Sequence, residues 1–265
     1  MAERTDFAVR LARRFESHVI GVAAADEGLV GADFSSGFKG SDSLAAAIDS
    51  SHRAAILRTR SFRERADALA LKSTHEIIDH QRDLESLVRR SACADLVIAA
   101  QPDAAWPDGA RARSLLERLV QHCIALTLVV PYAGDFPRAG SHVLIAWDGS
   151  RGSARAVVGA MPFLQRADNV SLIQCDTPVA VDRREGASDL EMPREWLGRH
   201  GVRLSAWLEA TPIEVGDTLL SRACDLGADL LVMGAWGQPR WAERMLGGVT
   251  RTILSSMTLP VLMSH

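Results

Sequence analysis

The residues whose types and spacing could do chemistry gather in two segments of the second half. Asp148-Gly149-Ser150 follows directly on the apolar run 143–147. The other segment lies between an apolar run and a helical pattern, and its candidates are Gly234, Gly237, Gly247, Gly248 and Thr250. Glycine lets a backbone approach a phosphate closely, and the N-terminus of the next helix offers free N–H groups at the positive end of its dipole. The spacing predicts an anion cradle, and Asp148 could accept hydrogen bonds from a ribose or an adenine beside it.

Other reactive residue types point to no second chemistry. The four cysteines, at 93, 123, 175 and 224, lie far apart and are expected to be buried, inert thiols. His75 and His80 lack a third ligand at useful spacing, so no metal site is predicted. The sequence holds neither a G-x-x-x-x-G-K-[ST] run nor a G-x-S-x-G elbow, which argues against a P-loop phosphotransferase or a serine hydrolase.

Alternating strands and helices must position the two segments. Short apolar runs bounded by polar residues indicate strands buried on both faces, at 18–22, 95–99, 126–130, 142–146, 170–173, 202–207, 229–233 and 260–263. Helical patterns separate them, the longest at 44–71. The alternation predicts an α/β fold with parallel sheets and helices on both faces. Since ligands of such sheets bind outside the carboxyl ends of the strands, Asp148 and the glycines fall at the expected edge.

The chain repeats itself. An offset of 134 residues overlays 94–98 on 228–232 and 125–129 on 259–263, so each half ends strand, loop, helix, strand. An offset near 151 overlays the fronts of the halves. The Pro/Gly-containing stretch 132–140 predicts a boundary between domains at 1–138 and 139–265. The first domain then lacks the counterpart of strand 143–146, through either a shortened domain or a start site placed downstream of the true one.

The second half resembles a universal stress protein domain. The resemblance rests on 146–150, on 228–234, on the Gly-x2-Gly-x9-Gly spacing at Gly234, Gly237 and Gly247, and on 260–263. It extends weakly over 6–131. It implies two tandem domains of the adenine-nucleotide-hydrolase-like type, each with a parallel sheet of about five strands. It also implies pairing through the last strand, as a homodimer or an intramolecular pseudo-dimer, and binding of ATP or AMP in one subgroup, with Mg²⁺ accompanying ATP.

The resemblance also assigns roles to the candidate residues. Asp148 would contact the nucleoside, Gly234 the ribose, and Gly237, Gly247 and Gly248 the phosphates. The family pattern has Ser or Thr where this chain has Gly248, and Thr250 could supply the hydroxyl instead. The alternative is that these glycines only shape a turn and a helix start. At the matching positions of the first half stand Ala100, Asp103 and Arg113, so no nucleotide site is predicted there.

The composition of the chain limits the classes of partner that it is expected to bind. With 30 Lys and Arg against 33 Asp and Glu the net charge is −3, which argues against a nucleic-acid or anionic-membrane binder. No apolar run approaches a membrane span and no signal peptide is visible, so a cytoplasmic protein is expected. The leading hypothesis is a nucleotide-binding stress-response protein that catalyses at most slow ATP hydrolysis. A structural or interaction module of the same fold is the alternative, and an unrelated α/β enzyme ranks third.

Overall fold

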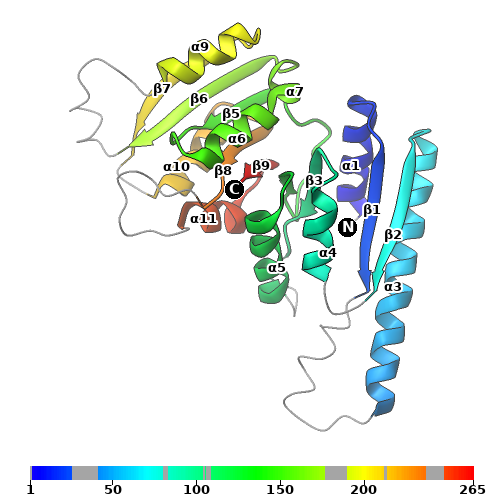
Figure 1. Ribbon diagram of the computed structural model, residues 1–265. Coiled ribbons are helices and arrows are strands. Elements are labelled where there is room, and N and C mark those ends of the chain that lie inside the picture. The colour runs from blue at the N-terminus through cyan, green and yellow to red at the C-terminus, as the bar shows by residue number, and fades with distance from the viewer. Residues whose placement is uncertain are drawn as a thin grey trace. The chain divides into compact units, whose positions relative to one another are not determined.

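The computed structural model describes residues 2–25, 41–79, 83–103, 105, 109–176, 190–211, 214–236 and 248–265 (Figure 1). The strands are β1 (Val19–Ala25), β2 (Ser73–Asp79), β3 (Leu96–Ala100), β4 (Leu126–Val130), β5 (His142–Ala146), β6 (Asn169–Asp176), β7 (Ser205–Ala210), β8 (Leu230–Gly234) and β9 (Val261–Ser264). The helices are α1 (Ala2–Arg14), α3 (Ser41–Ala68), α4 (Asp83–Ser91), α5 (Gly109–His122), α6 (Arg151–Gly159), α7 (Met161–Leu164), α9 (Glu191–Arg199), α10 (Val215–Asp225) and α11 (Gly248–Ser256). The predicted α/β alternation is confirmed. None of the described helices is long and apolar enough to cross a membrane.

The chain divides into two compact units, residues 1–89 and 90–265. The first unit contains a two-stranded parallel sheet in which Val19 of β1 pairs with Ser73 of β2. Helix α3 packs on both strands, and Gly21 permits the close approach of Phe62. An ion pair of 2.5 Å between Arg65 and Asp6 ties α3 to α1.

The second unit contains a seven-stranded sheet in the order β3-β4-β9-β8-β5-β6-β7. Its pairs are parallel except that β4 runs antiparallel to β9, with Leu128 opposite Leu262. The central strands carry continuous apolar runs because helices cover both faces of the sheet. Leu144, Leu231 and Leu262 are fully buried at 0% exposure.

The structure bears out the repeat strand by strand. Strand β3 corresponds to β8 at the offset of 134, residue for residue, and β4 overlaps β9 at the same offset. Strand β1 corresponds to 170–176 of β6 at the offset of 151. Helix α1 occupies the place of α6 and α7, and among the described residues no strand precedes it.

Strand β5 of the second half has no counterpart among the described residues of the first half. Its place in the strand order bears on how the sheets divide. In the second half the order β9-β8-β5-β6-β7 puts the first strand, β5, at the centre. Among the described residues, the first half has counterparts of the outer four strands, and these form the pairs β1-β2 and β3-β4. The second pair joins the other half through β4 and β9. The compact units therefore divide at residue 89 rather than in the stretch 132–140 where the sequence repeat divides.

Candidate functional site

The two predicted segments meet at the carboxyl edge of the seven-stranded sheet. Strands β5 and β8 are parallel neighbours, with Ala146 opposite Met233, so Asp148 and Gly234 both follow on the same edge. Asp148 is exposed, and its Oδ1 accepts a hydrogen bond of 2.9 Å from the backbone N–H of Ser150. Gly149 between them has φ +71°, a left-handed conformation that glycine adopts without strain. The turn holds an accessible carboxylate at the end of β5.

Ser150 then begins helix α6. Its Oγ accepts a hydrogen bond of 3.1 Å from the backbone N–H of Ser153, the usual arrangement of an N-cap. The turn and cap lie directly over the end of β8, because α6 packs on β8 and β9.

Gly234 makes that packing close. A Cβ on Gly234 would lie 2.6 Å from the backbone N of Ser153 and 3.0 Å from the carbonyl carbon of Gly152. Only a glycine lets the first turn of α6 come so near to β8. The lack of a side chain at Gly234 is thus used by the protein's own helix, a packing role that differs from both the ribose contact and the turn-shaping role considered from the sequence.

The chain after Gly234 is tied to β9 and to α11. The N–H of Ala235 donates to the carbonyl of Ser264 at 2.7 Å, and the N–H of Trp236 donates to the hydroxyl of Thr250 at 3.0 Å. Trp236 has φ +49° and packs edge-on against His265, with ring centroids 6.5 Å apart. Thr250 is 3% exposed in the first turn of α11, so its hydroxyl is a buried acceptor for this turn.

The structure therefore places four of the six predicted site residues. Asp148, Gly234 and Thr250 stand as just described, and Gly248 is the first residue of α11. Gly237 and Gly247 lie outside the described residues. The backbone N–H of Trp236, two residues after Gly234, bonds to the hydroxyl of Thr250. Gly234 itself lies against the first turn of α6, which follows the Asp148 turn.

Trp147, the residue directly before Asp148, carries a buried polar group that the sequence did not reveal. Its indole Nε1 is buried and has no hydrogen-bond partner among the described residues, while its backbone N–H donates to Ile173 at 2.8 Å. An indole N–H usually finds a partner when buried, and leaving a donor unsatisfied costs about 1–3 kcal/mol. The signal in the sequence was an aromatic residue directly before Asp-Gly-Ser.

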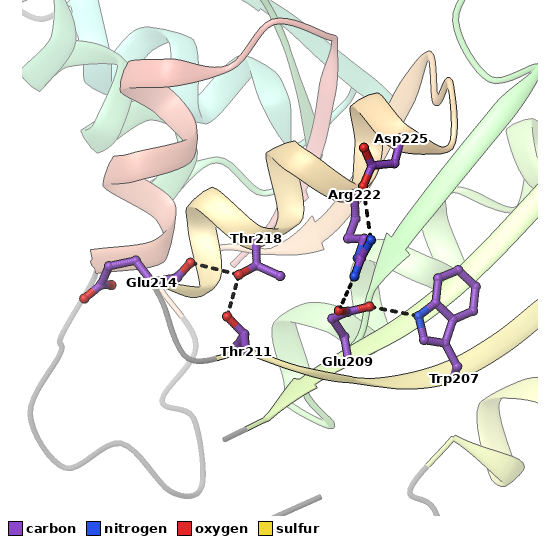
Figure 2. A network of polar contacts seen from close by, with 7 residues as sticks. All are labelled: Trp207, Glu209, Thr211, Glu214, Thr218, Arg222 and Asp225. Carbon is purple, nitrogen blue, oxygen red and sulfur yellow. Dashed lines mark hydrogen bonds and ion pairs between the residues drawn. The ribbon is translucent and has the colours of Figure 1, made fainter. Parts of the chain in front are cut away.

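A polar network at the end of β7 was also missed (Figure 2). The carboxylate of Glu209 accepts hydrogen bonds from Arg222 at 2.8 Å and from the indole of Trp207 at 3.1 Å, and Arg222 also reaches Asp225 at 3.1 Å. The hydrogen bond from Arg222, supported by that from Trp207, lowers the pKa of Glu209, and the bond to Glu209 raises the pKa of Arg222. These contacts fasten α10 to β7.

Two threonines form a separate group of contacts near the start of α10. The hydroxyls of Thr211 and Thr218 are 2.5 Å apart, and Thr218 donates to the carbonyl of Glu214 at 3.3 Å. Figure 2 shows the two groups, with Thr211, Glu214 and Thr218 in one and Arg222, Glu209, Trp207 and Asp225 in the other. The printed partners in both groups are side chains and carbonyls of this chain, so the contacts serve to fix the helix.

The cysteines are only partly as expected. Cys175 is of intermediate exposure, and burial, with the negative charge of Glu209 adding to it, raises the pKa of its thiol to about 12. A thiol with a raised pKa is a poor nucleophile at neutral pH. Cys93 and Cys224 are exposed, which corrects the expectation of buried thiols. Cys224 follows the buried Ala223 on α10, and helix periodicity turns it outward. No three His, Cys, Asp or Glu side chains among the described residues converge as metal ligands.

No family model matches this sequence, and no curated protein matches it. Solved structures do. A universal stress protein from Archaeoglobus fulgidus DSM 4304 superposes with a TM-score of 0.65 at 15% identity, over 82% of this chain and 78% of that one. A functionally unknown protein from Pseudomonas aeruginosa PAO1 superposes with a TM-score of 0.54 at 13% identity, over 92% of this chain and 91% of that one.

At such identities the likeness concerns the fold. The chain has the tandem α/β fold of a universal stress protein, and the resemblance noted in the sequence is confirmed at that level.

Proposed function

We propose that this chain acts as a universal stress protein in stress response or signalling and binds an adenine nucleotide, ATP or AMP, through its second half. The observation that carries the proposal is the meeting of the exposed Asp148 carboxylate with the Gly234–Trp236 turn at the carboxyl edge of β5 and β8. Ligands of doubly wound sheets bind outside this edge.

The candidate residues fit a nucleotide in their chemistry. Asp148 would accept hydrogen bonds from the nucleoside, and the N-terminus of α11, which begins at Gly248, would offer N–H groups to the phosphates. With ATP, Mg²⁺ would accompany the phosphates. No general base stands out among these residues, so hydrolysis would be slow at most.

A module of the same fold that binds no nucleotide is the second candidate. Two observations favour it. The hydroxyl of Thr250, which would have to replace the missing Ser or Thr at Gly248, already receives the N–H of Trp236. The space at Gly234 is taken by α6. Such a protein would act through its surfaces as an interaction partner.

Calorimetry and thermal unfolding with ATP and AMP, with and without Mg²⁺, distinguish the two. A specific site stabilises the fold by about 2.7 kcal/mol at a ligand concentration 100 times Kd. Asp148→Ala should abolish the shift. Asp168→Ala is the matched control, since Asp168 lies just before the amino end of β6, away from the site edge. If neither nucleotide gives heat or a shift with the unaltered chain, the nucleotide-binding proposal is wrong and the interaction module is favoured.

A further inference from the structure

Gln101, the residue after β3, forms hydrogen bonds to three other residues of the second compact unit. Its side-chain Nε2 donates to the carbonyl of Leu254 in α11 at 2.9 Å, and this bond is buried. Its Oε1 accepts from the backbone N–H of Tyr132 at 3.1 Å, and its own backbone N–H donates to the carbonyl of Val130 at 2.8 Å. Gln101 thus connects the ends of β3 and β4 to a helix more than a hundred residues further along the chain.

The direction of the strands explains why Gln101 meets the last turn of α11. Strand β4 runs antiparallel to β9, with Val129 opposite Val261, so the carboxyl ends of β3 and β4 lie at the same edge as the amino end of β9. Helix α11 ends shortly before β9. Leu254 is one of the last four residues of α11, and the carbonyls of such residues have no partner within their own helix. Gln101 satisfies one of these carbonyls.

The repeat shows that this use of position 101 differs between the halves. At the offset of 134, Gln101 corresponds to Ala235 and Val130 corresponds to Ser264. The backbone bond is the same in both halves, since the N–H of Ala235 donates to the carbonyl of Ser264. The side chains differ, because alanine has no polar group with which to reach a helix end. A position that belongs to the candidate site in the second half therefore supports α11 when it occurs in the first half.

The other end of α11 contacts the candidate site. The hydroxyl of Thr250, in the first turn of α11, accepts the N–H of Trp236 at 3.0 Å. This bond fixes the Gly234–Trp236 turn on which the proposed function rests. Ile253 and Leu254 are at most 1% exposed, so the helix between the two hydrogen bonds is packed in the core. A rigid, packed helix of nine residues can carry a displacement from its last turn to its first turn.

We propose that Gln101 is a positioning residue for the nucleotide site, an assignment that rests on the proposed function. Through α11 and Thr250, it holds the Gly234–Trp236 turn in the position that a ligand beside Asp148 requires. The first half, which has no predicted nucleotide site of its own, thereby contributes to ligand binding in the second half. Because coupling of this kind is reciprocal, a bound nucleotide should in turn stabilise the hydrogen bond between Gln101 and Leu254.

The test measures the affinity of full-length variants for ATP and AMP, with and without Mg²⁺, by titration calorimetry. Gln101→Met has a side chain of similar size that cannot donate to Leu254, and Gln101→Glu puts a carboxylate oxygen in the place of the donor. Each variant should raise Kd about three-fold or more. The two variants differ in charge, so that one remains if the other does not fold. Gln165→Glu is the matched control and should leave Kd unchanged, because Gln165 likewise donates to a carbonyl at a helix end, that of His200 after α9.

Two further measurements separate positioning from a general loss of stability. Leu197→Ala removes a fully buried side chain of α9, so it should lower the urea midpoint without changing Kd. Amide exchange followed by NMR tests the route through α11. In Gln101→Met the N–H of Trp236 should exchange about three-fold faster or more, whereas the N–H of Ala235, which bonds to Ser264, should exchange as in the unaltered chain.

The proposal is overturned if both Gln101 variants bind nucleotide within about two-fold of the unaltered chain. It is also overturned if Leu197→Ala weakens binding as much as they do, or if the exchange of Trp236 does not change. In these cases the unaltered chain still binds nucleotide, and the proposed function stands. If the unaltered chain binds neither ATP nor AMP, the proposed nucleotide binding and the role of Gln101 in it are both wrong.

Discussion

Two features could require a glycine at position 234, the close approach of a ligand or the close approach of a helix. The first turn of α6 fills the space beside it, so a side chain there meets backbone atoms that cannot rotate away. We expect Gly234→Ala to destabilise the protein by about 1–3 kcal/mol, the usual cost of overpacking, measured as the urea midpoint. Gly198→Ala is the control: it lies in α9, where a Cβ would meet no heavy atom within 4 Å beyond the helix's own backbone, so it should be neutral or stabilising. Equal loss in both variants would contradict the packing argument.

The four thiols should separate by reactivity. Cys93 and Cys224 are exposed, Cys123 and Cys175 are of intermediate exposure, and the raised pKa of Cys175 keeps that residue as the protonated thiol at neutral pH. With an aromatic disulfide reagent at pH 8, two thiols should react quickly and Cys175 only after unfolding. Cys175→Ser should leave the fast phase unchanged, and Cys224→Ser should halve it. A fast phase that loses amplitude in Cys175→Ser would show that this thiol is accessible.

At the scale of elements, the ion pair between Glu209 and Arg222 links the edge strand β7 to α10. The pKa of Glu209 is lower in the folded protein than in the unfolded chain, because the Arg222 hydrogen bond favours the carboxylate. Its contribution to stability is therefore complete above the unfolded pKa, near 4.5, and is lost as the pH falls through the lower folded pKa.

We expect Glu209→Gln to lower the urea midpoint at pH 7 and to show a weaker dependence of stability on pH below about 4.5 than the unaltered chain. Glu195→Gln is the control, since the Glu195–Arg199 pair is 3.8 Å apart and both side chains are 68% exposed, so it should follow the unaltered chain. If the urea midpoints of the two variants change with pH in the same way, Glu209 does not contribute to the acid dependence of stability.

The elements that sequence patterns predicted best are the continuous apolar strands. Strands β3, β5 and β8 fall within one residue of their predicted bounds because the apolar run of each is unbroken. Strand β2, with sequence STHEIID, was missed, since its polar residues hide the period. The last strand before α10 runs Ser205–Ala210 rather than 202–207. Its later residues include the charged Glu209, which pairs with Arg222 and does not fit the apolar pattern by which strands were predicted.

The candidate site was predictable to a lesser degree. The Asp148 turn and the glycine of β8 follow from the strands that precede them, so their shared edge could be foreseen. Three features of the site depend on packing between residues far apart in the chain, which no local pattern encodes. They are the N–H that the Thr250 hydroxyl accepts, the burial of the Trp147 indole, and the first turn of α6 beside Gly234.

At the scale of the whole molecule, the two compact units differ in how much apolar surface they bury. The first unit has a two-stranded sheet, which is marginal by itself, whereas the second has seven strands around one core. We expect hydrogen exchange to show opening of β1 and β2 at lower free energy than opening of β5 and β8. The measurement is native-state exchange read by mass spectrometry over increasing urea. Simultaneous opening of all four strands would mean that the chain unfolds as a single unit.

The antiparallel pair of β4 with β9 has a consequence for assembly. When two domains on separate chains pair through their last strands, the paired fraction depends on the protein concentration, and dilution separates the chains. Here Leu128 and Leu262 are on one chain, so the second strand is always present at the high effective concentration that a covalent link provides. The pair should therefore survive dilution to any level at which the fold itself persists.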